Sequence, residues 1–134
     1  MNSKKTYHKL RVRYGETDQM GYAYYGNYAT FFEVGRVEHL RSLGLSYRKL
    51  EESGIMLPVA DFSVKYIKPA FYDDELTVET QIDSLKGPRI VFSYELKRGD
   101  VLLAIASTTL VFVSSDSMRP IKPPSEVQSV IQSE

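Results

Sequence analysis

The chain has 134 residues, which is enough for one domain with its own hydrophobic core and short for two. Lysine plus arginine equals aspartate plus glutamate at 17 each, so the chain lacks the basic excess expected of a protein that binds nucleic acid or an anionic membrane. The absence of cysteine excludes disulfides, thiolate metal sites and a cysteine nucleophile, and two histidines alone do not make a typical zinc site.

The first six residues carry two lysines with no apolar stretch behind them, so we expect no signal peptide. The longest apolar run, residues 101–106, is too short to cross a bilayer. We therefore expect a cytoplasmic protein without membrane insertion.

The first predicted element covers residues 7–14, where the side chains alternate in character. Leu10, Val12 and Tyr14 share one side, and basic residues occupy positions 9, 11 and 13 on the other. A period of two predicts a β-strand with one buried face. Residues 14–28 follow and are the most informative segment, because a single aspartate, Asp18, stands among tyrosines and glycines just before a predicted helix.

The predicted helix begins at Asn27 as its N-cap, and Gly44 stands where a left-handed residue would end it. Gly35 in the helix interior costs about 1 kcal/mol relative to alanine, so we expect the helix to approach a sheet closely there. Ser46 is predicted to cap a short second helix that ends at Gly54.

The second half of the chain is predicted to be β-structure. Alternating segments occur at 61–66, 75–82 and 89–97, and the nearly continuous apolar run 101–113 is expected to be a central strand covered on both faces. Gly87-Pro88 and Gly99-Asp100 predict turns, the second a two-residue hairpin.

The order of a strand, a long helix and four strands predicts one α+β domain over residues 1–124, with one helix covering a five-stranded antiparallel sheet. The polar residues 125–134 are expected to form a tail that frays over the surface. The second face and the open edges of such a sheet need a partner, so we expect a homodimer, or a homotetramer made of two dimers.

Part of this sequence resembles the hot-dog fold acyl-CoA thioesterases. The segments that carry the resemblance are Glu16-Thr17-Asp18-Gln19-Met20-Gly21, Tyr24-Tyr25-Gly26-Asn27-Tyr28, Phe32-Glu33 and Arg36. The similarity is to the 4-hydroxybenzoyl-CoA thioesterase branch and the Tol-Pal-associated, YbgC-like branch, and it extends over roughly residues 7 to 124. It implies a curved sheet wrapped around one long helix, and hydrolysis of an acyl-CoA to free acid and coenzyme A without a further cofactor.

The resemblance also implies roles for individual residues. Asp18 is at the position of the family's catalytic carboxylate, and Tyr25 is at a position that is histidine in many members. Backbone N–H groups near Tyr25 and Gly26 would polarise the thioester carbonyl from the helix N-terminus. Asp18 would attack the carbonyl or activate a water, and Tyr25 would orient Asp18, orient the water or shape the pocket. The expected substrate-binding residues are Tyr24, Gly26, Asn27, Tyr28, Lys65 and Arg89, the last two as possible contacts for coenzyme A phosphates.

Each of these assignments has a structural alternative. Asp18 could be a turn residue bonded to its own backbone, and Glu16, the competing carboxylate, is by default a solvated loop residue. Glu33 is expected to form an ion pair with Arg36. Tyr24 and Tyr28 could be core residues, and Lys65, Arg89 and Arg98 solvated charges. His39 is expected at the helix–sheet interface or a dimer surface, and His8 in solvent.

Two other functions compete with the thioesterase. One is a non-catalytic acyl-CoA-binding module on the same fold. The other is a hot-dog hydratase or dehydratase, a class that resembles pairs of histidine with aspartate or glutamate in a deep tunnel. No histidine occurs in residues 14–28, which disfavours the second alternative.

Overall fold

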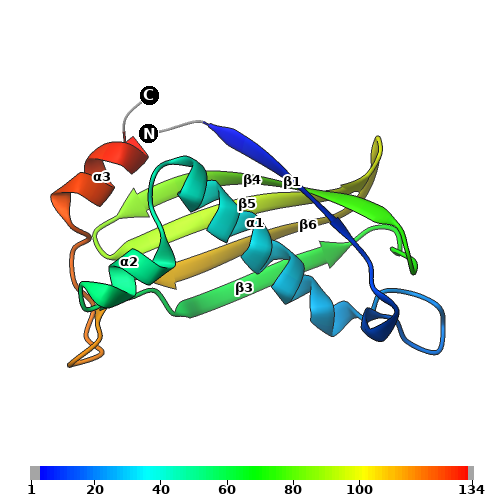
Figure 1. The fold of residues 1–134 in the computed structure, drawn as a ribbon, viewed down its shortest axis with the longest axis horizontal. Helices are drawn as coiled ribbons and strands as arrows, with labels where there is room; N and C mark the ends of the chain where they lie inside the picture. Colours follow the sequence, from blue (N-terminus) through cyan, green and yellow to red (C-terminus); the bar gives the residue numbers. More distant parts are fainter. Residues whose placement is uncertain (1–3, 133–134) are drawn as a thin grey trace.

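A single antiparallel sheet of five strands forms the frame of the molecule (Figure 1). The computed structural model describes residues 4–132. The strand order is β1, β4, β5, β6, β3, so β1 and β3 are the two edges. The strands are β1 (Lys5–Arg11), β3 (Val59–Tyr66), β4 (Glu75–Lys86), β5 (Arg89–Arg98) and β6 (Val101–Val111). The predicted α+β class, with one long helix on a five-stranded antiparallel sheet, is confirmed.

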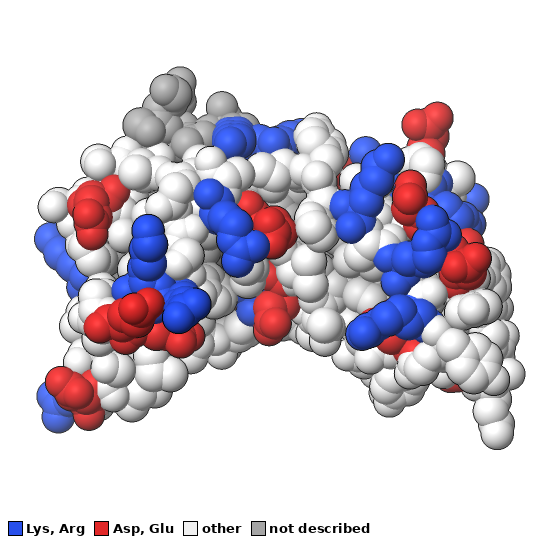
Figure 2. Space-filling view, viewed as in Figure 1, with Lys and Arg blue, Asp and Glu red and all other residues white. Residues whose placement is uncertain are grey.

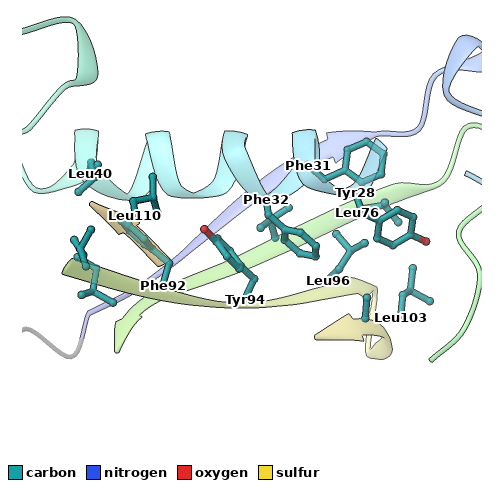
Figure 3. Close-up of a cluster of buried hydrophobic side chains, with 14 of the residues drawn as sticks. Tyr28, Phe31, Phe32, Leu40, Leu76, Phe92, Tyr94, Leu96, Leu103 and Leu110 are labelled. Carbon is teal, nitrogen blue, oxygen red and sulfur yellow. The ribbon is translucent and has the colours of Figure 1, made fainter. Parts of the chain in front are cut away.

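Helix α1 (Tyr28–Ser42) lies across one face of this sheet and closes the hydrophobic core (Figures 1 and 3). In Figure 3, Phe92 and Tyr94 point from β5 toward the helix, and the ring of Phe32 lies 4.9 Å from that of Tyr94. Because burial of each such side chain stabilises the fold by about 1.5–3 kcal/mol, this layer holds α1 on the sheet.

Gly35 allows the close approach that its place in the helix predicts. A Cβ atom at this position would lie 2.6 Å from Val78 Cγ1 and 2.7 Å from Thr80 Oγ1. No real Cβ tolerates such distances, so the glycine sets how deep the helix sits on β4.

The two ends of the long helix differ in how well they were predicted. Gly44 adopts φ +83° just beyond the C-cap Leu43, as predicted. Asn27 occupies the predicted N-cap position before Tyr28, but its backbone is helical and its side chain makes no capping hydrogen bond. The α-helix therefore begins where it was predicted, and a 3₁₀ turn, η2 (Tyr25–Asn27), which was not predicted, runs directly into it.

The first strand ends at Arg11, before the predicted residue 14. Val12 is buried as expected, and its N–H donates to Asp74 O at 3.0 Å. Tyr14 belongs to a 3₁₀ turn, η1 (Tyr14–Glu16), and is 78% exposed, so its predicted place on the buried strand face is wrong. The alternation ends where the chain leaves the sheet.

The predicted hairpin turns are confirmed by Gly87 and Gly99, which adopt φ +57° and +59°. β6 is an internal strand of the sheet, as predicted. The predicted cover on both of its faces is not present within one chain, because Ile105 on the outer face is 40% exposed. Val113 belongs not to β6 but to β7 (Val113–Ser114), which pairs with β2 (Ile55–Met56) in a separate two-stranded sheet.

Two short helices complete the fold. α2 (Tyr47–Glu52) is capped by Ser46 Oγ, which accepts the Lys49 N–H at 3.0 Å, as predicted. α3 (Ser125–Gln132) contradicts the expected frayed tail, because Val127 and Ile131 are buried and the helix packs near β4. The prediction is therefore wrong for residues 125–132, and 133–134 lie outside the described range.

His39 is buried at the helix–sheet interface, one of the two places predicted for it. Its Nδ1 lies 2.8 Å from Thr6 Oγ1, and its ring is edge-on to Phe92. Burial, with a smaller effect of Lys4, lowers the pKa of His39 to about 4. His8 is half-buried on β1 rather than exposed.

The surface over α1 mixes charged side chains of both signs, without a continuous basic area (Figure 2). No helix within residues 4–132 has the length and apolar character needed to cross a membrane.

Candidate active site

A compact loop joins β1 to the long helix and carries Asp18. Thr17 and Ala23 form an antiparallel bridge across it, and Gly21 adopts φ +82° at its tip. The Ala23 N–H donates to Ala70 O at 2.7 Å, which ties the loop to the segment between β3 and β4. The loop therefore holds a fixed position beside the start of the helical segment.

Asp18 stabilises the turn with one carboxylate oxygen and leaves the other without a hydrogen bond to the described residues. Its Oδ1 accepts hydrogen bonds from the Met20 N–H at 2.9 Å and the Tyr22 N–H at 3.3 Å. This is the local backbone bonding of an aspartate turn, so the structural alternative for this residue is real. Its other oxygen, Oδ2, makes no hydrogen bond to the residues that the structure describes. The turn thus orients the carboxylate and leaves one oxygen available.

An open groove of about 720 Å³ lies beside this carboxylate. Aromatic side chains dominate its walls, and the C-terminal end of β3 supplies one side. The lining residues are Asp18, Gln19, Met20, Tyr22, Ala23, Tyr24, Tyr25, Tyr28, Tyr66, Ile67, Lys68 and Pro69. Among the candidate site residues, Asp18, Tyr24, Tyr25 and Tyr28 all lie in the groove.

The three candidate tyrosines of the groove differ in burial. Tyr28 is 2% exposed and packs edge-on against Tyr66 at 4.9 Å, so it is both core and groove wall. Tyr24 and Tyr25 are 45% and 63% exposed. A hydrogen bond with Tyr25 raises the pKa of Tyr24, and the charge of Asp18 adds a smaller effect. The two hydroxyls and the carboxylate therefore belong to one electrostatic environment.

The start of the helical segment presents backbone donors at this groove. Within residues 4–132, the N–H groups of Tyr25 and Gly26 have no hydrogen-bond acceptor, as expected for the first residues of a helix. The Tyr25 carbonyl accepts a hydrogen bond from the Tyr66 hydroxyl at 3.2 Å, which anchors the turn to the end of β3. Because η2 continues into α1, the positive end of the helix dipole is here.

The space beside Gly26, which was expected to be left for a substrate, is occupied by the ring of Tyr24. A Cβ at this position would lie 2.6 Å from Tyr24 Cε2, so the Tyr24 ring occupies the space next to the glycine. Gly26 does not line the groove, and its effect is to let the Tyr24 ring cover the helix start.

Asn27 and Glu16 both make contacts that hold the loop together. The Asn27 side chain donates from Nδ2 to Glu16 O at 2.9 Å and does not line the groove. The Glu16 carboxylate accepts the Arg13 N–H at 2.8 Å and lies 3.1 Å from Arg13 Nη2. With its side chain 12% exposed, Glu16 is not the solvated residue that was expected.

The basic residues proposed for coenzyme A lie elsewhere within one chain. Lys65 is on the outer face of β3, and Arg89 is at the β4–β5 turn, at the other end of the sheet. Arg98 is held by Asp74 Oδ2 at 2.8 Å. Lys68 does line the groove, although it was not predicted as a site residue. Its position just after β3 and before Pro69 is the feature of the sequence that could have indicated this.

The family of this chain is shown by its sequence relatives. A family model described as "Thioesterase-like superfamily" matches residues 12–131. The chain belongs to this superfamily. The acyl-CoA thioesterase YbgC of Haemophilus influenzae is 35% identical over 121 residues, which cover 90% of this chain and 89% of that protein.

Solved structures confirm the hot-dog fold. The DHNA-CoA thioesterase of Staphylococcus aureus matches with a TM-score of 0.91 at 35% identity, over 94% of this chain and 87% of that one. A mutant of 4-hydroxybenzoyl CoA thioesterase complexed with 4-hydroxybenzoyl CoA matches with a TM-score of 0.87 at 25% identity, over 96% and 99%. The resemblance noted in the sequence and the expected class, a thioester hydrolase, are confirmed at the level of the family.

Proposed function

We propose that this protein hydrolyses acyl-CoA thioesters in the groove beside Asp18. The observation that carries the proposal is the meeting, in one groove, of a carboxylate with a free oxygen and the start of a long helix with unpaired N–H groups. The relatives named above are acyl-CoA or aroyl-CoA thioesterases, which supports the same substrate class.

The helix start supplies the electrostatic part of the reaction. In the proposed complex, the thioester carbonyl oxygen accepts a hydrogen bond from the Tyr25 N–H. The negative charge that develops on this oxygen is stabilised by that donor and by the helix dipole. One such preorganised donor contributes about 3–4 kcal/mol to transition-state stabilisation.

Asp18 can promote attack on the thioester carbonyl carbon by either of two routes. As a nucleophile, Oδ2 bonds to the carbonyl carbon, the C–S bond breaks, and coenzyme A leaves as thiolate; water then hydrolyses the mixed anhydride. As a general base, Oδ2 takes a proton from a water whose oxygen bonds to the same carbon. Both routes give the free acid and coenzyme A, and a thiolate leaving group needs no strong acid near it.

The test is hydrolysis of a panel of acyl- and aroyl-CoAs by wild type and by Asp18→Asn. We expect the substitution to lower kcat at least about 100-fold, because the amide is neither nucleophile nor base. Glu16→Gln is the matched control, since that carboxylate is occupied by Arg13, and its activity should persist if the loop stays folded. Equal rates for wild type and Asp18→Asn on every substrate would remove Asp18 from the mechanism.

The non-catalytic binding module remains the competing function. The aromatic groove would also suit a binder, but a binder needs no carboxylate with a free oxygen beside the carbonyl site. Tight binding of acyl-CoA by the wild type, with no release of coenzyme A for any substrate in the panel, would favour the module over the enzyme.

We also propose that the active assembly is at least a homodimer joined along β3. This strand is an edge, and its exposed apolar side chains include Val59, Phe62 and Tyr66. Figure 2 shows the molecule recessed along the lower margin, where β3 runs in Figure 1. A second copy that adds its own β3 would satisfy this edge, and two such dimers could form a tetramer.

A further inference from the structure

The Asp18 loop is supported by the connection between β3 and β4. The Ala23 N–H donates to Ala70 O at 2.7 Å, and Tyr22 pairs with Phe71 in an antiparallel bridge. The rings of Tyr22 and Phe71 meet edge-on, with their centroids 5.4 Å apart. Because the Asp18 carboxylate itself accepts the Tyr22 N–H, the position of this carboxylate depends on where the connection lies.

Arg98, the last residue of β5, holds this connection at three points. Its Nη1 donates to Asp74 Oδ2 at 2.8 Å and to Pro69 O at 3.2 Å. Its guanidinium carbon lies 5.8 Å from the centroid of the Phe71 ring. The Asp74 oxygen that binds Arg98 also accepts the Phe71 N–H, at 2.9 Å. Figure 1 shows the β3–β4 connection and the β5–β6 hairpin at the same end of the sheet, so one guanidinium can tie them together.

The start of the helical segment is held by other contacts. The Tyr25 carbonyl accepts from the Tyr66 hydroxyl at 3.2 Å, and the Asn27 side chain donates to Glu16 O at 2.9 Å. Neither contact involves Arg98 or a residue that it binds. Loss of Arg98 should therefore displace the carboxylate of the loop more than the Tyr25 N–H.

Arg98 is not among the residues that line the groove, so it would affect the reaction only through these contacts. Its side chain is 33% exposed and that of Asp74 is 22% exposed. An ion pair that water reaches contributes only modestly to stability. Its effect on geometry is larger, because displacement of a reacting group by about 1 Å can lower a rate about 100-fold.

We propose that Arg98 is a positioning residue that, through the β3–β4 connection, fixes the Asp18 carboxylate relative to the thioester carbonyl. This rests on the proposed thioesterase function and adds to its site a residue that lies outside the groove. The guanidinium touches neither the substrate nor the transferred proton; it determines where the carboxylate stands.

The first test compares kcat and KM of Arg98→Met with those of the wild type, on the acyl-CoA that the wild type hydrolyses best. We expect kcat to fall roughly 10- to 100-fold and KM to stay within about twofold, because bound substrate meets a displaced carboxylate. Asp74→Asn, which removes the charge that Arg98 binds, should lower kcat several-fold and serves if Arg98→Met does not fold. An unchanged kcat in both variants, or a change confined to KM, would overturn the proposal.

Lys97→Met is the matched control for this test. Lys97 precedes Arg98 on β5, its side chain is 35% exposed, and its Nζ also lies near a carboxylate, 3.6 Å from Glu95 Oε1. This variant removes a comparable charge that does not contact the β3–β4 connection, so it should keep the wild-type kcat. A loss of kcat equal to that of Arg98→Met would overturn the proposal.

The second test separates positioning from a general effect on the fold. A lysine at position 98 can still donate to Asp74, so Arg98→Lys should recover part of the kcat that Arg98→Met loses. In the Asp18→Asn background, Arg98→Met should change the residual rate by less than about twofold, because the carboxylate that it positions is absent. A loss as large as in the wild-type background would overturn the proposal, as would an Arg98→Lys protein no more active than Arg98→Met.

The third test does not depend on catalysis. Amide hydrogen exchange measured by NMR should be at least about tenfold faster in Arg98→Met than in the wild type at Phe71 and Ala23. The Asn27 amide at the helix start, which lies outside these contacts, should keep its rate. If Asp18→Asn proves as active as the wild type, the catalytic proposal fails while these rates still decide whether Arg98 holds the loop. Unchanged exchange at Phe71 and Ala23 would overturn the proposal whatever the activity.

Discussion

Replacing Gly35 by alanine tests how the fold places the start of the helical segment. Alanine favours helix over glycine by about 1 kcal/mol, so on an exposed helix this change would stabilise the protein. Here the new methyl would lie 2.6 Å from Val78 Cγ1 and 2.7 Å from Thr80 Oγ1, and both residues are fully buried. Val78 is β-branched and has little freedom to move aside.

Overpacking of this kind costs about 1–3 kcal/mol, so we expect Gly35→Ala to have a net cost near 1 kcal/mol. In a domain of this size, that lowers Tm by about 3–6 °C. Because the helix must lift off β4, the Tyr25 N–H should also shift from the groove and kcat should fall.

The control for this prediction is a double-mutant cycle with Val78→Ala, measured by urea unfolding. Val78→Ala alone should destabilise the protein by leaving a cavity. In the Gly35→Ala background it should cost less, because the alanine methyl occupies part of that space. A Gly35→Ala protein that is as stable as wild type or more so, with additive effects of the two changes, would refute the close contact between α1 and β4.

Three further predictions concern other parts of the molecule. Because the pKa of His39 is about 4 in the fold against an ordinary 6.5, the unfolded chain binds more protons between these values. Stability should be full above pH 6.5 and fall by at most about 3 kcal/mol as the pH drops to 4, and urea unfolding of His39→Gln should show a weaker loss. Ile131→Ala should destabilise the protein by about 2–4 kcal/mol, whereas Ser129→Ala on the exposed side of α3 should not. Equal urea-unfolding midpoints for the two variants would show that α3 does not pack on the fold. Asp61 and Lys65 are exposed on the same face of β3, so antiparallel pairing of two copies about Ser63 would place them opposite each other. In sedimentation velocity, Asp61→Lys should therefore weaken the dimer and the further change Lys65→Asp should restore it; a monomeric wild type at micromolar concentration would contradict the β3 pairing.

The features predicted well from the sequence are those set by local backbone chemistry. Gly44 and Gly99 adopt positive φ, and Ser46 caps α2, because these residue types favour those conformations wherever they stand. Gly35 predicted a close contact between the helix and the sheet, because a glycine inside a helix is otherwise unfavourable.

The features that were missed depend on contacts distant in the sequence. Asn27 stands at the N-cap position, but its side-chain amide donates to Glu16 O instead of capping the helix, and a 3₁₀ turn precedes it. Residues 125–132 look polar on average, yet Val127 and Ile131 are one helical turn apart and find a buried place on the sheet. That spacing was a usable signal in the sequence.

The candidate site was predicted in part. Asp18 and the tyrosines after it form one groove because they share one loop, which a local motif can indicate. Lys65 does not line the groove of its own chain, because strand alternation turns its side chain to the outer face of the sheet. The predicted ion pair of Arg36 with Glu33 is present at 3.9 Å, whereas the burial of Arg36 and the hydrogen bond that its Nε donates to the Tyr47 hydroxyl were not predicted, because they depend on where α2 packs.

The proposed reaction geometry is tested by a structure of the protein with an acyl-CoA analogue in which a methylene group replaces the sulfur. This analogue keeps the carbonyl and cannot release coenzyme A. We expect the carbonyl oxygen about 3 Å from the Tyr25 nitrogen, with the carbonyl carbon facing Asp18 Oδ2 directly or through one water. A bound analogue whose carbonyl lies outside the Asp18 groove would contradict this geometry.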